Sequence, residues 1–214
     1  MRIAIFGGAF DPVHLDHVRM AVDSLRFGYV DQVWMVPSPD RWDKVPQTPC
    51  EHRLAMLHIA LRDYAGSILA SDVEIHFEGY RGTYFLMNHL QKNYPEHSFH
   101  LLVGADSVEN IPMWRDPKEY NGTNPNGEAL LREFPLIVYP RKGYGSLEIE
   151  TDFVAKGYPE PKCFLNNHPD LPSILPGEAA SRILRTSLWS DSLSRQELPS
   201  GVWDYIESNH LYMN

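Results

Sequence analysis

The 214-residue sequence predicts an α/β protein of the Rossmann-like, doubly wound class, with a mostly parallel sheet covered by helices on both faces. Two observations predict this fold. Short apolar runs alternate with longer segments of helical periodicity along the chain. The first apolar run, residues 3–6, leads through two glycines into an amphipathic helix, as at the start of a nucleotide-binding unit. A chain of this length buries a full core, so we expect one domain over residues 1–214.

The turn between the first strand and helix, residues 7–12, is a candidate phosphate site. Gly7 and Gly8 carry no Cβ, so backbone N–H groups in the turn can approach a ligand closely. Apolar residues at positions 18, 21, 22 and 25 predict the helix that follows. Its first turn offers free N–H groups and the positive end of the helix dipole, both of which favour phosphate.

Two histidines, His14 and His17, begin this helix three residues apart, so we expect their rings on one face. Imidazoles can donate hydrogen bonds to phosphate oxygens and gain positive charge as they do so. One ring could instead cap the loop while the other is a surface residue. Two histidines at this spacing behind a Gly-Gly turn favour phosphate binding.

The next segments continue the alternation of strands and helices. Residues 32–37 predict a buried strand, and the polar loop 38–46 beyond it should face the same crevice as the Gly-Gly turn. Lys44 in this loop is a candidate phosphate contact. Thr48 should cap the following helix, and Arg53 within that helix is expected on the surface.

Apolar patterns predict four more strands and a helix between them. Residues 73–77 alternate as a half-exposed strand should, and residues 83–94 have helical spacing. Residues 99–103 and 135–139 read as buried strands, and residues 162–165 as an edge strand.

Two side chains beyond the 99–103 strand could contact a ligand, because this strand should also end at the crevice. Asp106 could accept hydrogen bonds from ligand hydroxyls, or it could cap a short helix. Trp114 could stack on a flat ring, although packing against the protein would also explain a tryptophan there.

The last third of the chain offers a second candidate phosphate grip. Residues 143–161 carry no clear signal, whereas residues 179–188 and 199–212 predict helices. Arg182 and Arg185 lie three apart on the first of these helices, and guanidinium donors match phosphate oxygens.

Composition and charge exclude several classes of protein. The 43% hydrophobic and 22% charged residues are ordinary for a globular protein, and no apolar run approaches the ~20 residues needed to cross a bilayer. Cys50 and Cys163 are isolated, which fits a reducing compartment, so we expect a cytoplasmic protein. The net charge of −9 argues against nucleic-acid binding but not against a small polyphosphate ligand, which needs only local positive groups.

Residues 8–17, with the sequence GAFDPVHLDH, resemble the nucleotidyltransferase signature G-x-F-D-P-x-H-x-G-H, with Asp16 in place of its last glycine. Further segments resemble the bacterial nicotinate-mononucleotide adenylyltransferases from end to end. Residues 104–107 with Trp114 are similar to that family's G-x-D-S…W segment, and residues 203–212 are similar to its Y-I…L-Y ending.

Three motifs of that family are only partly kept. The I-S-S-T-x-I-R motif falls on residues 179–185 and matches at Ser181 and Arg185. The Y-T-x-x-T-L segment matches at Thr83, and the P-P-H-K loop leaves only Lys44.

The resemblance implies that a mononucleotide phosphate attacks the α-phosphorus of ATP, giving a dinucleotide and pyrophosphate without a covalent intermediate. It places His14 and His17 on the ATP phosphates and Arg185 on the leaving pyrophosphate. The other residues that it implies for ATP and its phosphates are Gly7, Gly8, Ala9, Phe10, Ser181, Arg182 and Lys44.

The same resemblance places Asp106, Trp114 and Thr83 on the mononucleotide side, with Trp114 near the pyridine ring. Mg²⁺ would arrive with ATP and need few protein ligands, because this ion keeps several waters. The expected partners are ATP and a pyridine mononucleotide, with no nucleic acid and no membrane, and a homo-oligomer is left open.

Three alternatives stay open at this stage. The base could be nicotinate or nicotinamide, and a related enzyme could use another acceptor, such as pantetheine phosphate, or transfer a cytidylyl group. The chain could also be a nucleotide-binding regulator without catalysis, because a carboxylate at Asp16 ~6 Å from a phosphate would cost roughly 3 kcal/mol. That carboxylate could point away from the phosphates, hold Mg²⁺ or pair with Arg182.

Overall fold

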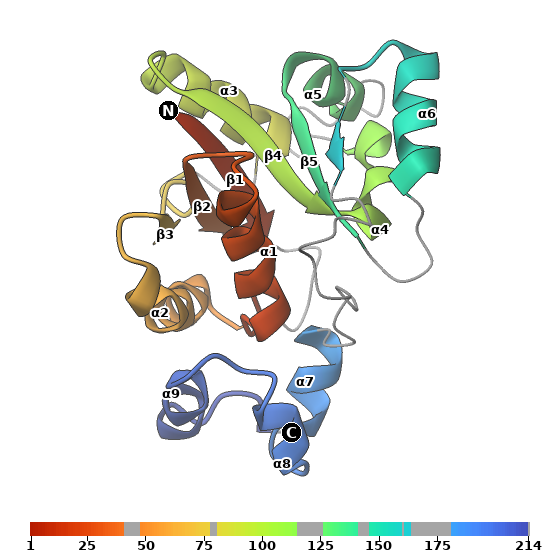
Figure 1. Cartoon of the computed structure of the whole chain (residues 1–214). Helices are drawn as coiled ribbons and strands as arrows, with labels where there is room; N and C mark the ends of the chain where they lie inside the picture. The colour runs from red at the N-terminus through yellow and green to blue at the C-terminus, as the bar shows by residue number, and fades with distance from the viewer. Residues whose placement is uncertain are drawn as a thin grey trace.

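The computed structural model describes residues 1–40, 48–77, 81–114, 126–140, 146–159, 161–163 and 181–213. These residues form a six-stranded sheet with helices on both faces, which confirms the predicted α/β class (Figure 1). Every strand pair that they form is parallel. The strand order is β3-β2-β1-β4-β5-β6, with β1 at Arg2–Gly8, β2 at Gln32–Pro37, β3 at Ile68–Ala70, β4 at Ser98–Gly104, β5 at Leu136–Tyr139 and β6 at Lys162–Cys163.

Strand β1 lies in the middle of the sheet and is buried on both faces. Ile3 and Ile5 pack into one hydrophobic core, and Ala4 and Phe6 pack into the other. The chain moves outward through β2 and β3 on one side of β1, then returns to β4 on the other side. Ligands of such sheets bind at the carboxyl ends of the strands where the order reverses, so Gly8 ends at the expected crevice.

Helices pack on both faces of this sheet. Side chains of α1 (Leu15–Arg26), α2 (Cys50–Leu61) and α9 (Val202–Ser208) share a core with the Phe6 face. Side chains of α3 (Thr83–Asn93), α4 (Ala105–Val108), α5 (Gly127–Glu133) and α6 (Ser146–Lys156) share the core on the other face. The remaining short helices are η1 (Arg62–Tyr64), η2 (Ile111–Met113), α7 (Ser181–Ser187) and α8 (Ser192–Arg195). Within the described residues, no helix combines the length and the apolar character needed to cross a membrane.

The predicted strand at residues 73–77 is wrong. These residues form turns, and the edge strand β3 lies earlier, where Ile68 pairs with Val33 of β2. Val73 and Phe77 instead pack beside the core under α3. Their alternation therefore comes from packing against a helix and not from a strand.

Two helix starts also differ from the prediction. Thr48 does not cap α2, because the helix begins at Cys50 with Pro49 as its N-cap, and the Thr48 N–H donates to the Asp11 carboxylate at 3.3 Å. Asp106 lies inside the first turn of α4, with Gly104 as the N-cap. Helix α6 lies where the sequence carries no clear signal.

The segment 181–213 packs beside the carboxyl end of β1, far from it in sequence. Figure 1 shows α7, α8 and α9 gathered below α1 and α2. The Leu15 N–H donates to the Glu197 carbonyl over 2.8 Å, and the Tyr205 hydroxyl lies 2.9 Å from Nδ1 of His52. These contacts bring the two predicted phosphate-binding segments, residues 7–17 and 181–185, to one end of the sheet.

Candidate active site

The turn from β1 into α1 is shaped by close aromatic packing. A Cβ added to Gly8 would lie 3.0 Å from Cζ of Phe10, whereas a Cβ added to Gly7 would have no atom within 4 Å. Phe10 is buried at a φ of 49°, and its ring meets Phe6 edge-on at 5.3 Å. A cis peptide bond joins Asp11 to Pro12. A side chain at Gly8 would therefore press on the buried Phe10 ring, whereas Gly7 borders open space.

His14 and His17 lie side by side at the start of α1, as predicted. Their rings stack with centroids 3.7 Å apart and planes 28° apart. The backbone N–H of His14, the N-cap residue, donates to Nδ1 of His17 at 3.3 Å. A neutral His17 therefore carries its proton on Nε2, which makes that atom a hydrogen-bond donor. The Phe10 ring packs edge-on against His17 at 5.0 Å and fixes the ring further.

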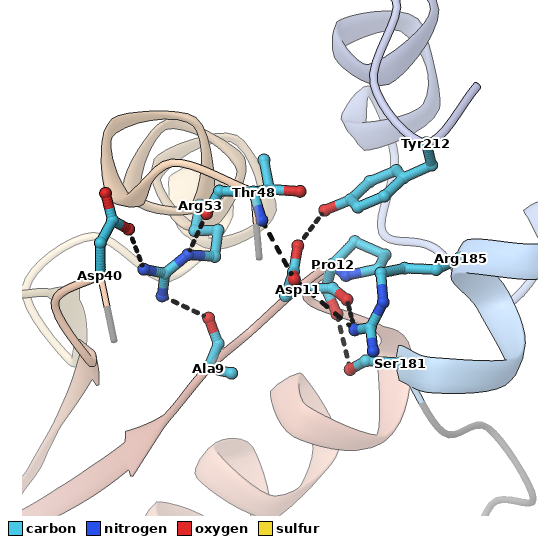
Figure 2. A network of polar contacts seen from close by, with 9 residues as sticks. All are labelled: Ala9, Asp11, Pro12, Asp40, Thr48, Arg53, Ser181, Arg185 and Tyr212. Carbon is cyan, nitrogen blue, oxygen red and sulfur yellow. Dashed lines mark hydrogen bonds and ion pairs between the residues drawn. The ribbon is translucent and has the colours of Figure 1, made fainter. Parts of the chain in front are cut away.

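Asp11 is a buried carboxylate that joins three segments of the chain (Figure 2). Its Oδ1 accepts a hydrogen bond from the Tyr212 hydroxyl at 2.7 Å. Its Oδ2 accepts from the Thr48 N–H at 3.3 Å and lies 3.6 Å from Nη1 of Arg185. Neither Asp11 nor Tyr212 is singled out by the sequence analysis, although both lie in segments that resemble family motifs.

Arg185 and Ser181 reach this turn from α7, which brings two predicted residues to the histidine pair. Nη1 of Arg185 also donates to the main-chain oxygen of Asp11. The Ser181 hydroxyl donates to the main-chain oxygen of Pro12 at 3.0 Å (Figure 2). About a third of the Arg185 side chain is exposed, so the guanidinium borders the crevice.

Arg53 contacts the turn from α2, and the expectation that it lies on the surface is wrong. Its side chain is fully buried. The guanidinium donates to the carbonyls of Ala9 and Thr48 at 2.8 and 2.7 Å and to Oδ1 of Asp40 at 3.0 Å (Figure 2). The spacing in the sequence could have predicted this burial, because Arg53 lies three residues before Met56 and so on the same buried face of α2.

Two of the three residues predicted for the mononucleotide meet in a small pocket. Thr83, at the start of α3, lines it together with Trp114 and Gly127. A Cβ on Gly127 would lie 1.6 Å from the carbonyl oxygen of Ile111, so only glycine lets α5 pack this closely. Asp106 is exposed at the end of β4 and does not line this pocket.

Comparison with known proteins agrees with this arrangement. A family model described as cytidylyltransferase-like matches residues 5–178. A probable nicotinate-nucleotide adenylyltransferase of Rhodopirellula baltica is 34% identical over 98% of this chain and 92% of the relative. The chain belongs to the nicotinate-nucleotide adenylyltransferase family. The resemblance drawn from the sequence motifs is thereby confirmed.

Further relatives of the adenylyltransferase family match over nearly their whole length. A probable nicotinate-nucleotide adenylyltransferase of Oceanobacillus iheyensis is 31% identical, covering 98% of this chain and 96% of the relative. The structure of Plasmodium falciparum nicotinic acid mononucleotide adenylyltransferase complexed with NaAD covers 99% of this chain and 97% of that chain, with 24% identity and a TM-score of 0.78. This similarity shows that the adenylyltransferase fold is shared.

The remaining predicted phosphate contacts of this adenylyltransferase have different outcomes. Arg182 is exposed and, among the described residues, makes no hydrogen bond or ion pair. Lys44 lies outside the described residues.

Asp16 does not pair with Arg182, so that hypothesis is wrong. It is buried, with a carboxylate oxygen 3.7 Å from Nη1 of Arg19 one helical turn along α1. Tyr139 at the end of β5 packs against the same helix, where its hydroxyl donates to Oδ2 of Asp23 at 2.9 Å, and burial together with the carboxylates of Asp23 and Asp16 raises the pKa of this phenol. Asp16 therefore lies on the side of α1 that faces β5.

A larger hollow of about 570 Å³ opens at the β3 edge of the sheet, and none of the predicted site residues that the structure describes lines it. Among the described residues, its lining includes the rings of Trp34, Phe77 and Tyr94 and the imidazoles of His76 and His89, but no lysine or arginine.

Proposed function

We propose that this chain transfers the adenylyl group of ATP to nicotinate mononucleotide, giving nicotinate adenine dinucleotide and pyrophosphate in NAD biosynthesis. The observation that carries the proposal is the convergence of the stacked His14 and His17, the Gly-Gly turn and Arg185 at the carboxyl end of β1. The full-length match to relatives named for this reaction supports the same assignment.

His17 and His14 contact the ATP phosphates in this proposal. Nδ1 of His17 is occupied by the His14 N–H, so Nε2–H is the donor that can reach a phosphate oxygen. The two rings stack on each other, and the Phe10 ring packs edge-on against His17, so the donors are held in place by protein contacts. Such preorganised donors stabilise charge that develops in the transition state, because they need not reorient.

The reaction is an in-line displacement. An oxygen of the mononucleotide phosphate forms a bond to the α-phosphorus of ATP, and the bond from that phosphorus to the bridging oxygen of the β-phosphate breaks. The electron pair of the broken bond leaves with pyrophosphate. Arg185 and Ser181 lie beside the histidines, where Arg185 would neutralise the leaving group.

Mg²⁺ fits this site as an ion held chiefly by phosphate oxygens and water. The nearby carboxylates of Asp11 and Asp16 are already engaged by Arg185 and Arg19. When bound with ATP, Mg²⁺ would neutralise part of the negative charge on the phosphate oxygens. One group of three potential metal ligands converges among the described residues, but it includes a thiol, which Mg²⁺ disfavours: Asp40, Cys50 and Glu51.

The mononucleotide occupies the side of the crevice near Thr83 and Trp114 in this proposal. Their shared pocket, at the start of α3, holds only about 10 Å³, so in this proposal the pyridine ring stacks on the partly exposed Trp114 beside the pocket and not inside it. Asp106, exposed at the end of β4, would accept hydrogen bonds from ribose hydroxyls. We propose nicotinate as the base because the matched relatives are named for it.

Residues 1–214 act as one unit in this proposal, because the proposed active site draws on both ends of the chain. Tyr212 and Arg185 contact Asp11 near the N-terminus. A fragment without residues 181–213 would lose Arg185 and would therefore lack the group proposed to neutralise pyrophosphate.

The test is pyrophosphate release by the purified protein with ATP, Mg²⁺ and nicotinate mononucleotide. Parallel reactions contain nicotinamide mononucleotide or pantetheine phosphate. Turnover that is fastest with nicotinate mononucleotide is the expected result. Turnover with only another acceptor would reassign the substrate, and ATP binding without any turnover would favour the nucleotide-binding regulator.

A further inference from the structure

Tyr212 connects the far end of the described chain to the proposed ATP-binding turn. Its hydroxyl donates to Oδ1 of Asp11 over 2.7 Å (Figure 2). Burial and the nearby Asp11 carboxylate raise the pKa of this phenol, so it stays a hydrogen-bond donor at any physiological pH. The hydrogen bond therefore does not switch with pH in the working range.

The backbone of Tyr212 is held in an unfavourable conformation. Its φ is 58°, in the left-handed region that a bulky L-residue rarely adopts. Two hydrogen bonds secure the residue before it: the Leu211 N–H donates to Ile206, and the Leu211 carbonyl accepts from Nε1 of Trp189 at 2.9 Å. The surrounding contacts thus direct the phenol toward Asp11 at a cost in backbone energy, which is common at functional sites.

The Asp11 carboxylate contacts Tyr212 through Oδ1 and both the Thr48 N–H and Arg185 through Oδ2, and Arg185 also donates to the main-chain oxygen of Asp11. Oδ1 accepts from the phenol, and Oδ2 lies 3.6 Å from the guanidinium, which is longer than a charge-assisted hydrogen bond. Without the phenol, a buried carboxylate oxygen would lose its donor. The carboxylate would then gain by turning toward the only neighbouring cation among its described contacts, Arg185.

We propose that Tyr212 is a positioning residue for adenylyl transfer: it holds the Asp11 carboxylate so that Arg185 can leave Asp11 for the pyrophosphate. The inference rests on the proposed function and deepens it. Tyr212 contacts no reacting atom in this scheme and acts through Asp11.

The experiment compares Tyr212→Phe with Tyr205→Phe in pyrophosphate release. Both changes remove one hydroxyl from the same segment and keep the ring, but the Tyr205 hydroxyl contacts His52 on α2 and not the turn. We expect Tyr212→Phe to lower kcat roughly tenfold, with KM for nicotinate mononucleotide within about twofold of wild type. Tyr205→Phe should keep kcat within about twofold of wild type.

A double-mutant cycle with Asp11→Asn separates positioning from simple structural support. The uncharged amide that this change introduces holds Arg185 less tightly than the carboxylate does, so the double variant should be no slower than Tyr212→Phe alone. Losses in kcat that add strictly across the two changes would overturn the positioning role. Equal kcat for Tyr212→Phe and Tyr205→Phe, with only a lowered Tm, would overturn it as well. A wild-type protein without turnover would overturn the proposed function and this inference together.

Discussion

The guanidinium of Arg53 donates a hydrogen bond to the carbonyl oxygen of Ala9 over 2.8 Å, so a buried charge supports the turn that joins β1 to α1. The same guanidinium holds Thr48 and Asp40. Two loops at the carboxyl end of the sheet, the β1–α1 turn and the connection from β2 to α2, therefore share one donor. This arrangement supports the turn of the proposed ATP site through buried hydrogen bonds.

Removing Arg53 should destabilise the protein strongly. Arg53→Met leaves the Ala9 and Thr48 carbonyls without their donor, and we expect a loss of about 3 kcal/mol in the free energy of unfolding. Asp40→Asn is the matched control, because the Asp40 side chain is 58% exposed and its pair should contribute less than about 1 kcal/mol. Urea unfolding of both variants measures the difference, and equal losses would contradict the supporting role of Arg53.

The two glycines of the turn should respond differently to alanine. Gly8→Ala places a methyl group 3.0 Å from the Phe10 ring and should cost about 1–3 kcal/mol of stability. Gly7→Ala meets no atom within 4 Å, so its stability should match wild type. If ATP occupies that space, Gly7→Ala should raise KM for ATP by about tenfold, as for a loss of ~1.4 kcal/mol. Thermal unfolding and steady-state kinetics on both variants check the pair, and an unchanged KM in Gly7→Ala would place ATP elsewhere.

The roles of the two ring nitrogens of His17, Nδ1 and Nε2, can be tested separately by substitution. Asn at this position can supply an acceptor near Nδ1 but no donor at Nε2, whereas Gln can supply a donor near Nε2. We expect His17→Asn to keep the stability of wild type and lose about a hundredfold in kcat. His17→Gln should keep more activity. The opposite ranking in pyrophosphate release would show that the cap, and not the Nε2 donor, matters for turnover.

Trp114 should affect one substrate and not the other. It shares a pocket with Thr83, away from the histidine pair, so Trp114→Ala should raise KM for the mononucleotide by about tenfold, as a lost stacking contact of roughly 1.5 kcal/mol would. KM for ATP should stay within about twofold of wild type. Initial rates at varied concentrations of each substrate provide the test. If KM for ATP rose more than KM for the mononucleotide, Trp114 would belong to the ATP side of the proposed site and not to the mononucleotide side.

Asp31 should contribute to stability in a defined pH range. Its hydrogen bonds to Arg2 lower the pKa of the carboxyl to about 2 in the folded protein, below its usual 3.8. The contribution is present above pH 3.8 and is lost as the pH falls toward 2, where the folded protein also takes up the proton. Between about pH 5 and about pH 2.5, the urea midpoint should fall further for wild type than for Asp31→Asn. Equal falls would show that this exposed pair adds nothing.

The sequence alone determined the alternation of strands and helices, the Gly-Gly turn and the family, because these depend on local periodicity and short motifs. It also placed His14 and His17 together, since three residues on a helix bring two side chains to one face. The motif at Ser181 and Arg185 pointed to the same site from the other end of the chain. Each of these predictions needed only neighbouring residues.

Only the tertiary structure decided the roles of Arg53, Asp11 and Tyr212. An arginine on a helix reads as a surface residue unless the loops that bury it are known, and Asp11 meets Tyr212 across 201 positions of sequence. The edge strand was likewise decided by pairing, because Ile68 and not Val73 lies beside β2. Burial and long-range hydrogen bonds depend on which distant segments the fold packs together, and local sequence patterns do not show this packing.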